Sequence, residues 1–213
     1  MEITSSKAIR LGKKTYELLE GVYRNRQERR IREFLEYIDL RYESMTPEDQ
    51  EKLNQHINSE FGQDILADYI DTILKTSSKR ARMAVALLFC RDIDFNFNET
   101  ETRTFVSAMN GMTDDLLDFF LEVSILETKK EDFPYPRAGI HDKIFERFSS
   151  KGWDEEAIFV NVTELIQLKI LLPDPMTHSN SFGSSSGWAI WFGLTRTSNK
   201  IASLLRKAEA LIR

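Results

Sequence analysis

The sequence predicts a mainly α protein, with an N-terminal multi-helix domain followed by a smaller α+β unit. Apolar residues recur at spacings of three and four through most of the first 127 residues, which is the period of an amphipathic helix. The β-prone runs and the Ser/Gly-rich loop come only after residue 168. Charged residues make up 30% of the chain and apolar residues 41%, which is typical of a folded globular protein.

About six helices are expected before residue 127. Their expected positions are 7–44 (as one helix or two), 47–59, 64–76, 79–90, 98–108 and 113–127. Thr46 and Pro47 mark a helix start, because a capping hydroxyl precedes proline in the first turn. Asn98 and Glu101 have the spacing of a capping box. Since no fixed internal period is present, the pattern indicates a helical bundle.

The character of the sequence changes after Leu126. Segment 128–139, TKKEDFPYPRAG, contains two prolines and a glycine and is the best candidate for a boundary. Beyond it we expect helices over 141–150 and 154–168, a short apolar run over 170–172, a polar loop, a β-prone segment over 188–194 and a closing helix from Thr195.

The order of these segments resembles the second half of a winged-helix domain. VTELIQLKILLPDP (162–175) is followed by the Ser/Gly loop 176–187, and WAIWFGLT (188–195) then leads directly into a helix. The resemblance implies a two-stranded wing around that loop, with 114–127 and 141–150 as the first two helices. The expected domains are therefore 1–112, helical, and 113–213, winged-helix-like.

The resemblance implies a recognition helix over 154–168, whose composition favours a protein partner over DNA. The polar side chains it displays are Glu155, Glu156, Asn161, Thr163, Glu164 and Gln167. No Arg or Lys occurs before Lys169, although reading a DNA groove requires cations for phosphates and donors for base edges. In the N-terminal part, RIREFLEYI and SSKRARMAVALL resemble segments of uncharacterised bacterial helical proteins, a likeness that implies no activity.

The net charge of −5 conceals segregated charges. Residues 1–33 hold nine Lys/Arg against five Glu, a net of +4, and residues 92–132 hold eleven Asp/Glu against three cations, a net of −8. Residues 196–213 hold five cations against one Glu, again +4. Either these segments face each other or solvent, or one basic segment binds a polyanion or an acidic partner.

Three groups of side chains are candidates for binding. They are the cations Arg26, Arg29 and Arg30, the cations Lys79, Arg80 and Arg82 near a helix start, and the aromatic residues Trp188 and Trp191. Cations at a helix start oppose the macrodipole unless an anion binds there. Each group also has a structural interpretation: a helix face with internal ion pairs, a solvated turn, and interdomain packing. Arg196 and Lys200 on the closing helix are candidates for contacts with a nucleic-acid backbone.

The sequence contains no pattern typical of a catalytic, metal or cofactor site. The three histidines are far apart, and neither a phosphate-binding loop nor a nucleophile elbow occurs. No metal ligand or cofactor is therefore expected. A metal-dependent hydrolase stays open only if several acids of the segment 92–118 converge, namely Asp92, Asp94, Asp114, Asp115 and Asp118.

The sequence also predicts a cytoplasmic protein without a membrane partner. No apolar run approaches the roughly 18 residues that span a bilayer, and the N-terminus lacks a secretory signal. The single cysteine, Cys90, excludes an intramolecular disulfide. We expect a non-enzymatic adaptor or regulator that docks another protein through a winged-helix-like module. A DNA- or RNA-binding regulator is the alternative, a hydrolase is the second one, and homo-oligomerisation is open.

Overall fold

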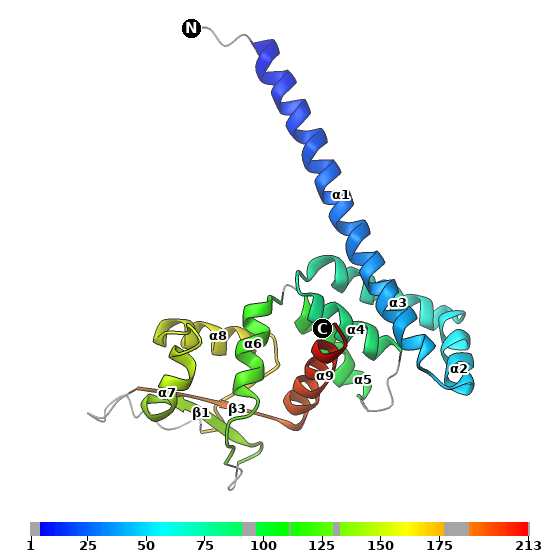
Figure 1. Cartoon of the computed structure of the whole chain (residues 1–213). Helices are drawn as coiled ribbons and strands as arrows, with labels where there is room; N and C mark the ends of the chain where they lie inside the picture. The colour runs from blue at the N-terminus through cyan, green and yellow to red at the C-terminus, as the bar shows by residue number, and fades with distance from the viewer. Residues whose placement is uncertain (1–4, 91–96, 111, 130–132, 177–187, 213) are drawn as a thin grey trace.

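The fold of the chain is seen in a computed structural model that describes residues 5–90, 97–110, 112–129, 133–176 and 188–212 (Figure 1). For residues 5–19, 56, 61 and 62 it describes the helical backbone only. Within these ranges the elements are α1 Ser5–Glu43, α2 Pro47–Ile57, α3 Glu60–Lys75, α4 Lys79–Phe89, α5 Glu99–Met109, α6 Asp114–Val123, β1 Arg137–His141, α7 Asp142–Ser149, α8 Glu155–Gln167, β2 Leu172–Pro173, β3 Ala189–Gly193 and α9 Arg196–Ile212. The expectation of a mainly α protein is confirmed.

Helix α1 is one continuous helix that extends far beyond the rest of the molecule (Figure 1). Among its described side chains Arg30 is the first that is buried, and residues 20–26 are all exposed. At about 1.5 Å per residue, residues 5–29 reach roughly 37 Å past that point. We call residues 5–29 the arm.

Helix α4 lies at the centre of the fold. Every residue from Ala81 to Phe89 is buried, and the helix packs against α1, α3, α5 and α9. Ser78 caps its start by accepting a hydrogen bond from the amide of Ala81 at 3.0 Å. The buried apolar residues form one continuous cluster that includes α4, α6, α8 and α9. This core therefore crosses the expected domain boundary at 112/113.

Local capping signals fix several helix starts. Asn98 and Glu101 form the predicted capping box, with both reciprocal hydrogen bonds at 2.9 Å. Thr113 caps α6 and Asp154 caps α8, as their positions in the sequence predict. None of the helices in the described ranges is both long and apolar enough to span a bilayer.

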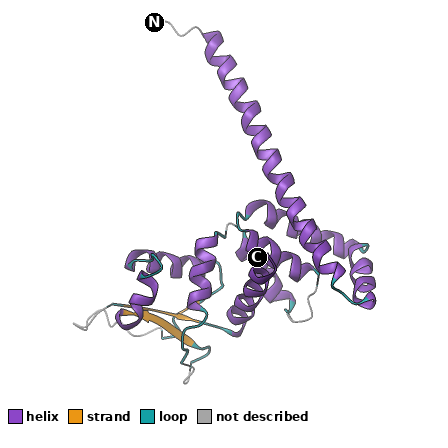
Figure 2. Ribbon diagram, viewed as in Figure 1, coloured by secondary structure: helices purple, strands orange, loops and turns teal. Residues whose placement is uncertain are grey.

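The strands form a three-stranded antiparallel sheet of order β1-β3-β2 (Figure 2). The two strands expected on either side of the loop are present as β2 and β3, and β1, which begins inside segment 128–139, adds a third strand that the sequence did not predict. Only Ala138 and Ile140 of β1 are buried. An alternation of buried and half-buried residues as short as this is too weak a pattern to predict a strand. Gly139 permits close packing, since a Cβ there would lie 2.3 Å from the ring of Trp191. Residues 177–187 of the expected wing lie outside the described residues.

Candidate functional site

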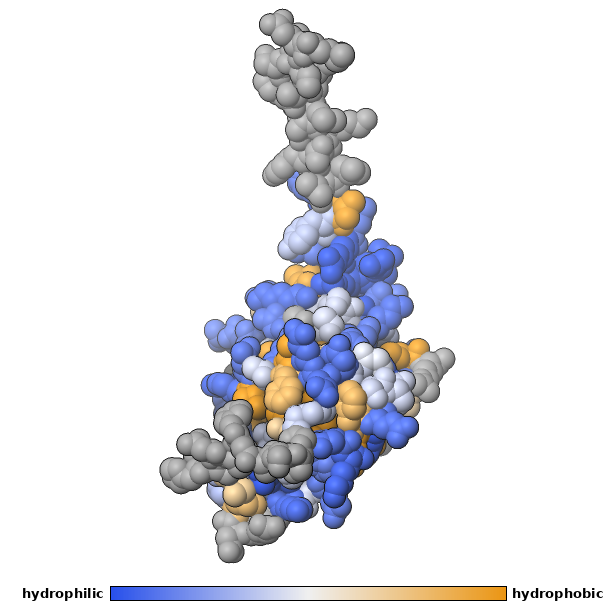
Figure 3. Space-filling view, turned by 90° about the vertical axis from the view of Figure 1, so that its left-hand side faces the viewer, coloured by the Kyte–Doolittle hydropathy of each residue, from blue (hydrophilic) through white to orange (hydrophobic). Residues whose placement is uncertain are grey.

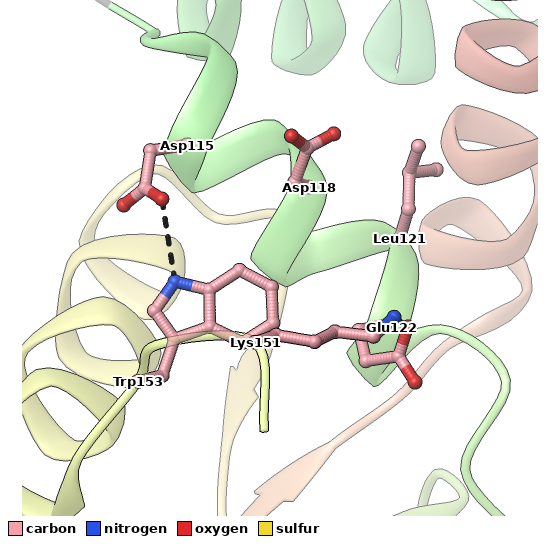
Figure 4. Close-up of a pocket in the computed structure, with 6 residues that line it drawn as sticks. All are labelled: Asp115, Asp118, Leu121, Glu122, Lys151 and Trp153. Atoms are coloured by element: carbon pink, nitrogen blue, oxygen red, sulfur yellow. Dashed lines mark hydrogen bonds and ion pairs between the residues drawn. The ribbon is translucent and has the colours of Figure 1, made fainter. Parts of the chain in front are cut away.

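An acidic groove lies between α6 and the N-terminal part of α8 (Figure 4). It consists of two adjoining hollows of about 350 and 430 Å³, which share Asp115, Lys151 and Trp153. The first hollow is also lined by Asp118, Leu121 and Glu122, and the second by Gly152, Asp154, Glu156, Ala157, Val160 and Asn161. We call the two together the α6–α8 groove.

The groove follows from the amphipathic period of α6. Leu116, Leu117, Phe119, Phe120 and Val123 face the core. The carboxylates of Asp115, Asp118 and Glu122 fall on the opposite face at spacings of three and four, and they line the first hollow. Helical periodicity thus places an acidic row along one wall of the groove.

Trp153 joins α6 to the start of α8. Its ring is 6% exposed and lies 5.2 Å from the ring of Phe119 in an edge-on contact. Its indole N–H donates to the Asp115 carboxylate at 3.3 Å (Figure 4). Gly152 precedes it with φ of 94°, a conformation that a residue with a Cβ rarely adopts. This turn places the indole between the two hollows.

Two cations hold the Glu122 carboxylate, which lies at the end of the first hollow. Arg147 of α7 and Lys151 both donate hydrogen bonds to it. Burial raises the pKa of Glu122, but the hydrogen bonds and charges of Lys151 and Arg147 outweigh burial, so its pKa is lowered below 4.5. The carboxylate is therefore a fixed negative charge that ties α6 to the segment before α8.

The lowered pKa of Glu122 predicts a loss of stability in acid. A group with a lower pKa in the folded state contributes stability that is complete above its unfolded value, near 4.5. That contribution is lost as the pH falls below this value towards the folded pKa. We expect Glu122→Gln to flatten the decline of the free energy of unfolding below pH 4.5, measured by urea titration at stepwise pH. An unchanged acid slope contradicts this role for Glu122.

The exposed side of α8 forms a second surface beside the groove. Phe159 is 41% exposed and Val160 is 55% exposed. Glu155 and Glu156 lie one turn before them, and Glu164 lies one turn after Val160. Figure 3 views the molecule from the side that carries α7 and α8, where apolar spots lie among hydrophilic ones. We call Glu155, Glu156, Phe159, Val160 and Glu164 the α8 face.

Of the two candidate tryptophans, Trp188 supports the α8 face. Its ring is 5.7 Å from that of Phe159 and 5.5 Å from that of Phe145. Trp191 lies on the other face of β3, where the guanidinium of Arg137 stacks 3.9 Å from its ring centroid. Both indoles are half-buried, so each packs within the fold, and only Trp188 adjoins the α8 face.

Two of the candidate cations are inside the protein. Arg82 is 4% exposed and donates to the Glu33 carboxylate and to the carbonyls of Thr76 and Ser77. Arg30 is 6% exposed and donates to the carbonyl of Leu74. The expectation that Arg30 and Arg82 lie on a binding surface therefore does not fit their burial. Leu74, 44 positions from Arg30, and Glu33, 49 positions from Arg82, accept hydrogen bonds that hold the two guanidinium groups inside the fold.

The other candidate cations differ in whether an acidic side chain pairs with them. Arg80 pairs with Asp118 at 2.6 Å, and Lys200 pairs with Glu101 at 2.7 Å. The remaining candidates, Arg26, Arg29, Lys79 and Arg196, are exposed on α1, α4 and α9. Burial and the nearby charges of Arg26, Arg82 and Arg29 lower the pKa of Arg30, so the first two candidate groups adjoin where α1 packs on α4.

Of the carboxylates proposed for a metal site, the structure describes Asp114, Asp115 and Asp118, and these three are not grouped as such a site requires. Among the residues that the structure describes, no three His, Cys, Asp or Glu side chains lie close enough to hold a metal ion. Asp115 bonds to Trp153, and Asp118 pairs with Arg80. Asp92 and Asp94 lie outside the described ranges.

Sequence reasoning missed the residues that give these surfaces their shape. They are Glu122, Lys151, Trp153, Phe159 and Val160. A signal for the last two exists, since Ile158, Val162 and Leu165 form the buried stripe of α8 and leave Phe159 and Val160 outside it. No protein-family model, curated protein or solved structure matched this chain when it was compared with them.

Proposed function

We propose that this protein is a non-enzymatic adaptor or regulator whose C-terminal part is a winged-helix module that docks another protein. The element order α6-β1-α7-α8-β2-β3 supports the module, because it supplies three helices followed by two antiparallel strands, with β1 added beside β3. Helix α9 then follows β3 directly, as the resemblance implies. In this arrangement α8 takes the place of the recognition helix.

The observation that carries the proposal is the chemistry of the α8 face. Phe159 and Val160 are exposed there between Glu155 and Glu156 on one side and Glu164 on the other. Carboxylates repel phosphates, whereas exposed apolar side chains gain free energy when a partner covers them. The face thus fits a partner segment that offers both apolar and cationic side chains, such as a basic amphipathic helix.

Nucleic acid is the weaker candidate because two cations of α9, Lys200 and Arg206, are engaged within the fold, which leaves Arg196 exposed. Lys200 pairs with Glu101, and Arg206 donates to the Leu121 carbonyl and the Ser124 hydroxyl. Phosphate binding requires cations that are free to replace condensed counterions. This observation favours protein over nucleic acid as the partner of the C-terminal part.

Replacing both apolar residues of the α8 face, Phe159→Asp with Val160→Asp, is expected to weaken docking strongly. The probe is a labelled helix built of leucine and lysine, and its binding is followed by fluorescence anisotropy. Losing about 2 kcal/mol of apolar burial weakens binding about thirtyfold. Ile125→Asp is a matched control, since Ile125 is 57% exposed outside the α8 face, and it should leave the affinity unchanged.

Two results would contradict the proposed function. One is equal affinity of the double variant and the wild type for the leucine–lysine helix. The other is tight binding of mixed-sequence duplex DNA that weakens steeply with salt, in place of binding to the helix. Thermal unfolding of each variant checks that the fold is retained.

A further inference from the structure

The arm carries apolar side chains that nothing in the described structure covers. Val22 is 58% exposed and Tyr23 is 63% exposed. In the sequence, Tyr16 and Leu19 precede Tyr23 at the spacing of one helix face. A helix that packs against nothing is only marginally stable in water, so most of its stability has to come from a surface that covers its apolar side. We therefore expect the arm, as an amphipathic helix, to be stabilised by a surface that covers its apolar side.

The charge of the arm narrows the choice of that surface. Residues 5–29 hold seven Lys/Arg against three Glu, a net of +4. Arg24 pairs with Glu20 at 3.0 Å, whereas Arg26 and Arg29 are exposed and form no ion pair with the described residues. Two arms packed side by side would bring like charges together, which is unfavourable. An acidic surface with exposed apolar side chains suits the arm better.

The α8 face and the α6–α8 groove together are such a surface. Carboxylates line the groove at Asp115, Asp118, Glu122, Asp154 and Glu156. Within the groove Asp118 pairs with Arg80, and Glu122 pairs with Arg147 and Lys151. Asp154 and Glu156 are exposed and form no ion pair with the described residues, so they supply its unpaired negative charge. Glu155 and Glu164 add further exposed negative charge beside Phe159 and Val160. The arm and this surface therefore match in charge and both expose apolar side chains.

The arm cannot reach the α8 face of its own chain. The arm is the N-terminal part of the single helix α1, and the rest of α1 packs against the body from Arg30 onward. Figure 1 shows the arm directed away from α6, α7 and α8. An occupant with the chemistry of the arm must come from another molecule.

We propose that the arm of one copy of this protein docks on the α8 face and the α6–α8 groove of a second copy. The inference rests on the proposed function and names its partner. Docking places Val22 and Tyr23 against Phe159 and Val160, and it brings the arginines of the arm to the carboxylates of the partner. Because each copy has one arm and one α8 face, two reciprocal contacts close a dimer, and single contacts extend a chain of copies.

The test is sedimentation velocity of the full-length chain and of two charge-reversed variants. Arg26→Glu with Arg29→Glu reverses the arm, and Glu155→Lys with Glu156→Lys reverses the α8 face. We expect the wild type to associate, and to associate more weakly as salt rises. Each variant alone should associate at least tenfold more weakly. An equimolar mixture of the two variants should form a heterodimer. The unchanged basic arm of the α8-face variant meets the unchanged acidic face of the arm variant, and the acidic arm of the latter meets the basic face of the former.

The matched control is Lys52→Glu with Arg103→Glu. It changes the net charge as much as reversal of the arm does, at exposed positions on α2 and α5. It should associate like the wild type. Association that survives reversal of the α8 face but not reversal of the arm would overturn the proposal, because the arm would then bind elsewhere.

A wild-type chain that stays monomeric at every concentration also overturns the inference. The proposed function still stands in that case if the leucine–lysine helix binds the α8 face, and it falls if that helix does not bind. The inference is likewise overturned if the arm binds duplex DNA or phosphatidylserine vesicles while the chain remains monomeric.

Discussion

Replacing Arg82 by alanine is expected to destabilise the protein by about 3 kcal/mol or more. The guanidinium is 4% exposed and is held by Glu33 of α1 and by the carbonyls of Thr76 and Ser77. Removing it leaves a half-buried carboxylate without its partner and two carbonyls without their donor, each of which costs free energy. The change also leaves a cavity beside the helix at the centre of the core.

Urea unfolding followed by circular dichroism measures this effect. Arg103→Ala is the control, because Arg103 forms an exposed pair with Glu99 one turn away, and such pairs contribute about 0.5 kcal/mol or less. Adding Glu33→Gln to Arg82→Ala should recover part of the loss, since it removes the charge left unpaired. Equal stability of Arg82→Ala and Arg103→Ala would show that the buried pair has no structural role.

Phe119→Ala is expected to cost about 3–5 kcal/mol, the range for truncating a fully buried phenylalanine. Phe119 has no exposed surface, and its ring lies 5.7 Å from Phe148 and 5.2 Å from Trp153. Because Trp153 lies between the two hollows of the groove, the cavity should also loosen that indole. We therefore expect weaker binding of the leucine–lysine helix even at temperatures where the variant is fully folded.

Phe159→Ala separates the contribution of the core from that of the surface. Phe159 is 41% exposed, so its truncation should cost less than about 1.5 kcal/mol of stability while still weakening docking. Chemical unfolding and fluorescence anisotropy on the same samples compare the two variants. If Phe119→Ala proves no more destabilising than Phe159→Ala, the packing of α6 against α7 and Trp153 is not what holds the groove.

Those features of the fold that depend on neighbours in the sequence could be predicted. The capping residues Asn98, Thr113 and Asp154 act within three residues of themselves, and the apolar stripes repeat every turn. The segments 7–44, 47–59 and 64–76 correspond closely to α1, α2 and α3. These signals are local and need no knowledge of the tertiary structure.

What could not be predicted depends on contacts between distant residues. In the sequence Arg82 is a basic residue near a helix start, and its buried pair with Glu33 joins residues 49 positions apart. Strand β1 exists because β3, about 50 residues later, pairs with it. The α6–α8 groove needs Trp153 to meet Asp115 across 38 positions. A single sequence does not specify such long-range contacts. The α8 face can be identified only when the buried side of α8 is known.

The packing of α9 against α4 has a consequence for how the chain is made. The apolar surface of α4 is synthesised more than 100 residues before α9, which covers part of it. At 5–20 residues per second, a ribosome needs about 5–20 s to reach α9 from the end of α4. During this interval the first half of the nascent chain exposes apolar surface that later belongs to the interior. Chaperone binding and aggregation during translation should therefore concentrate on α4 until α9 has emerged.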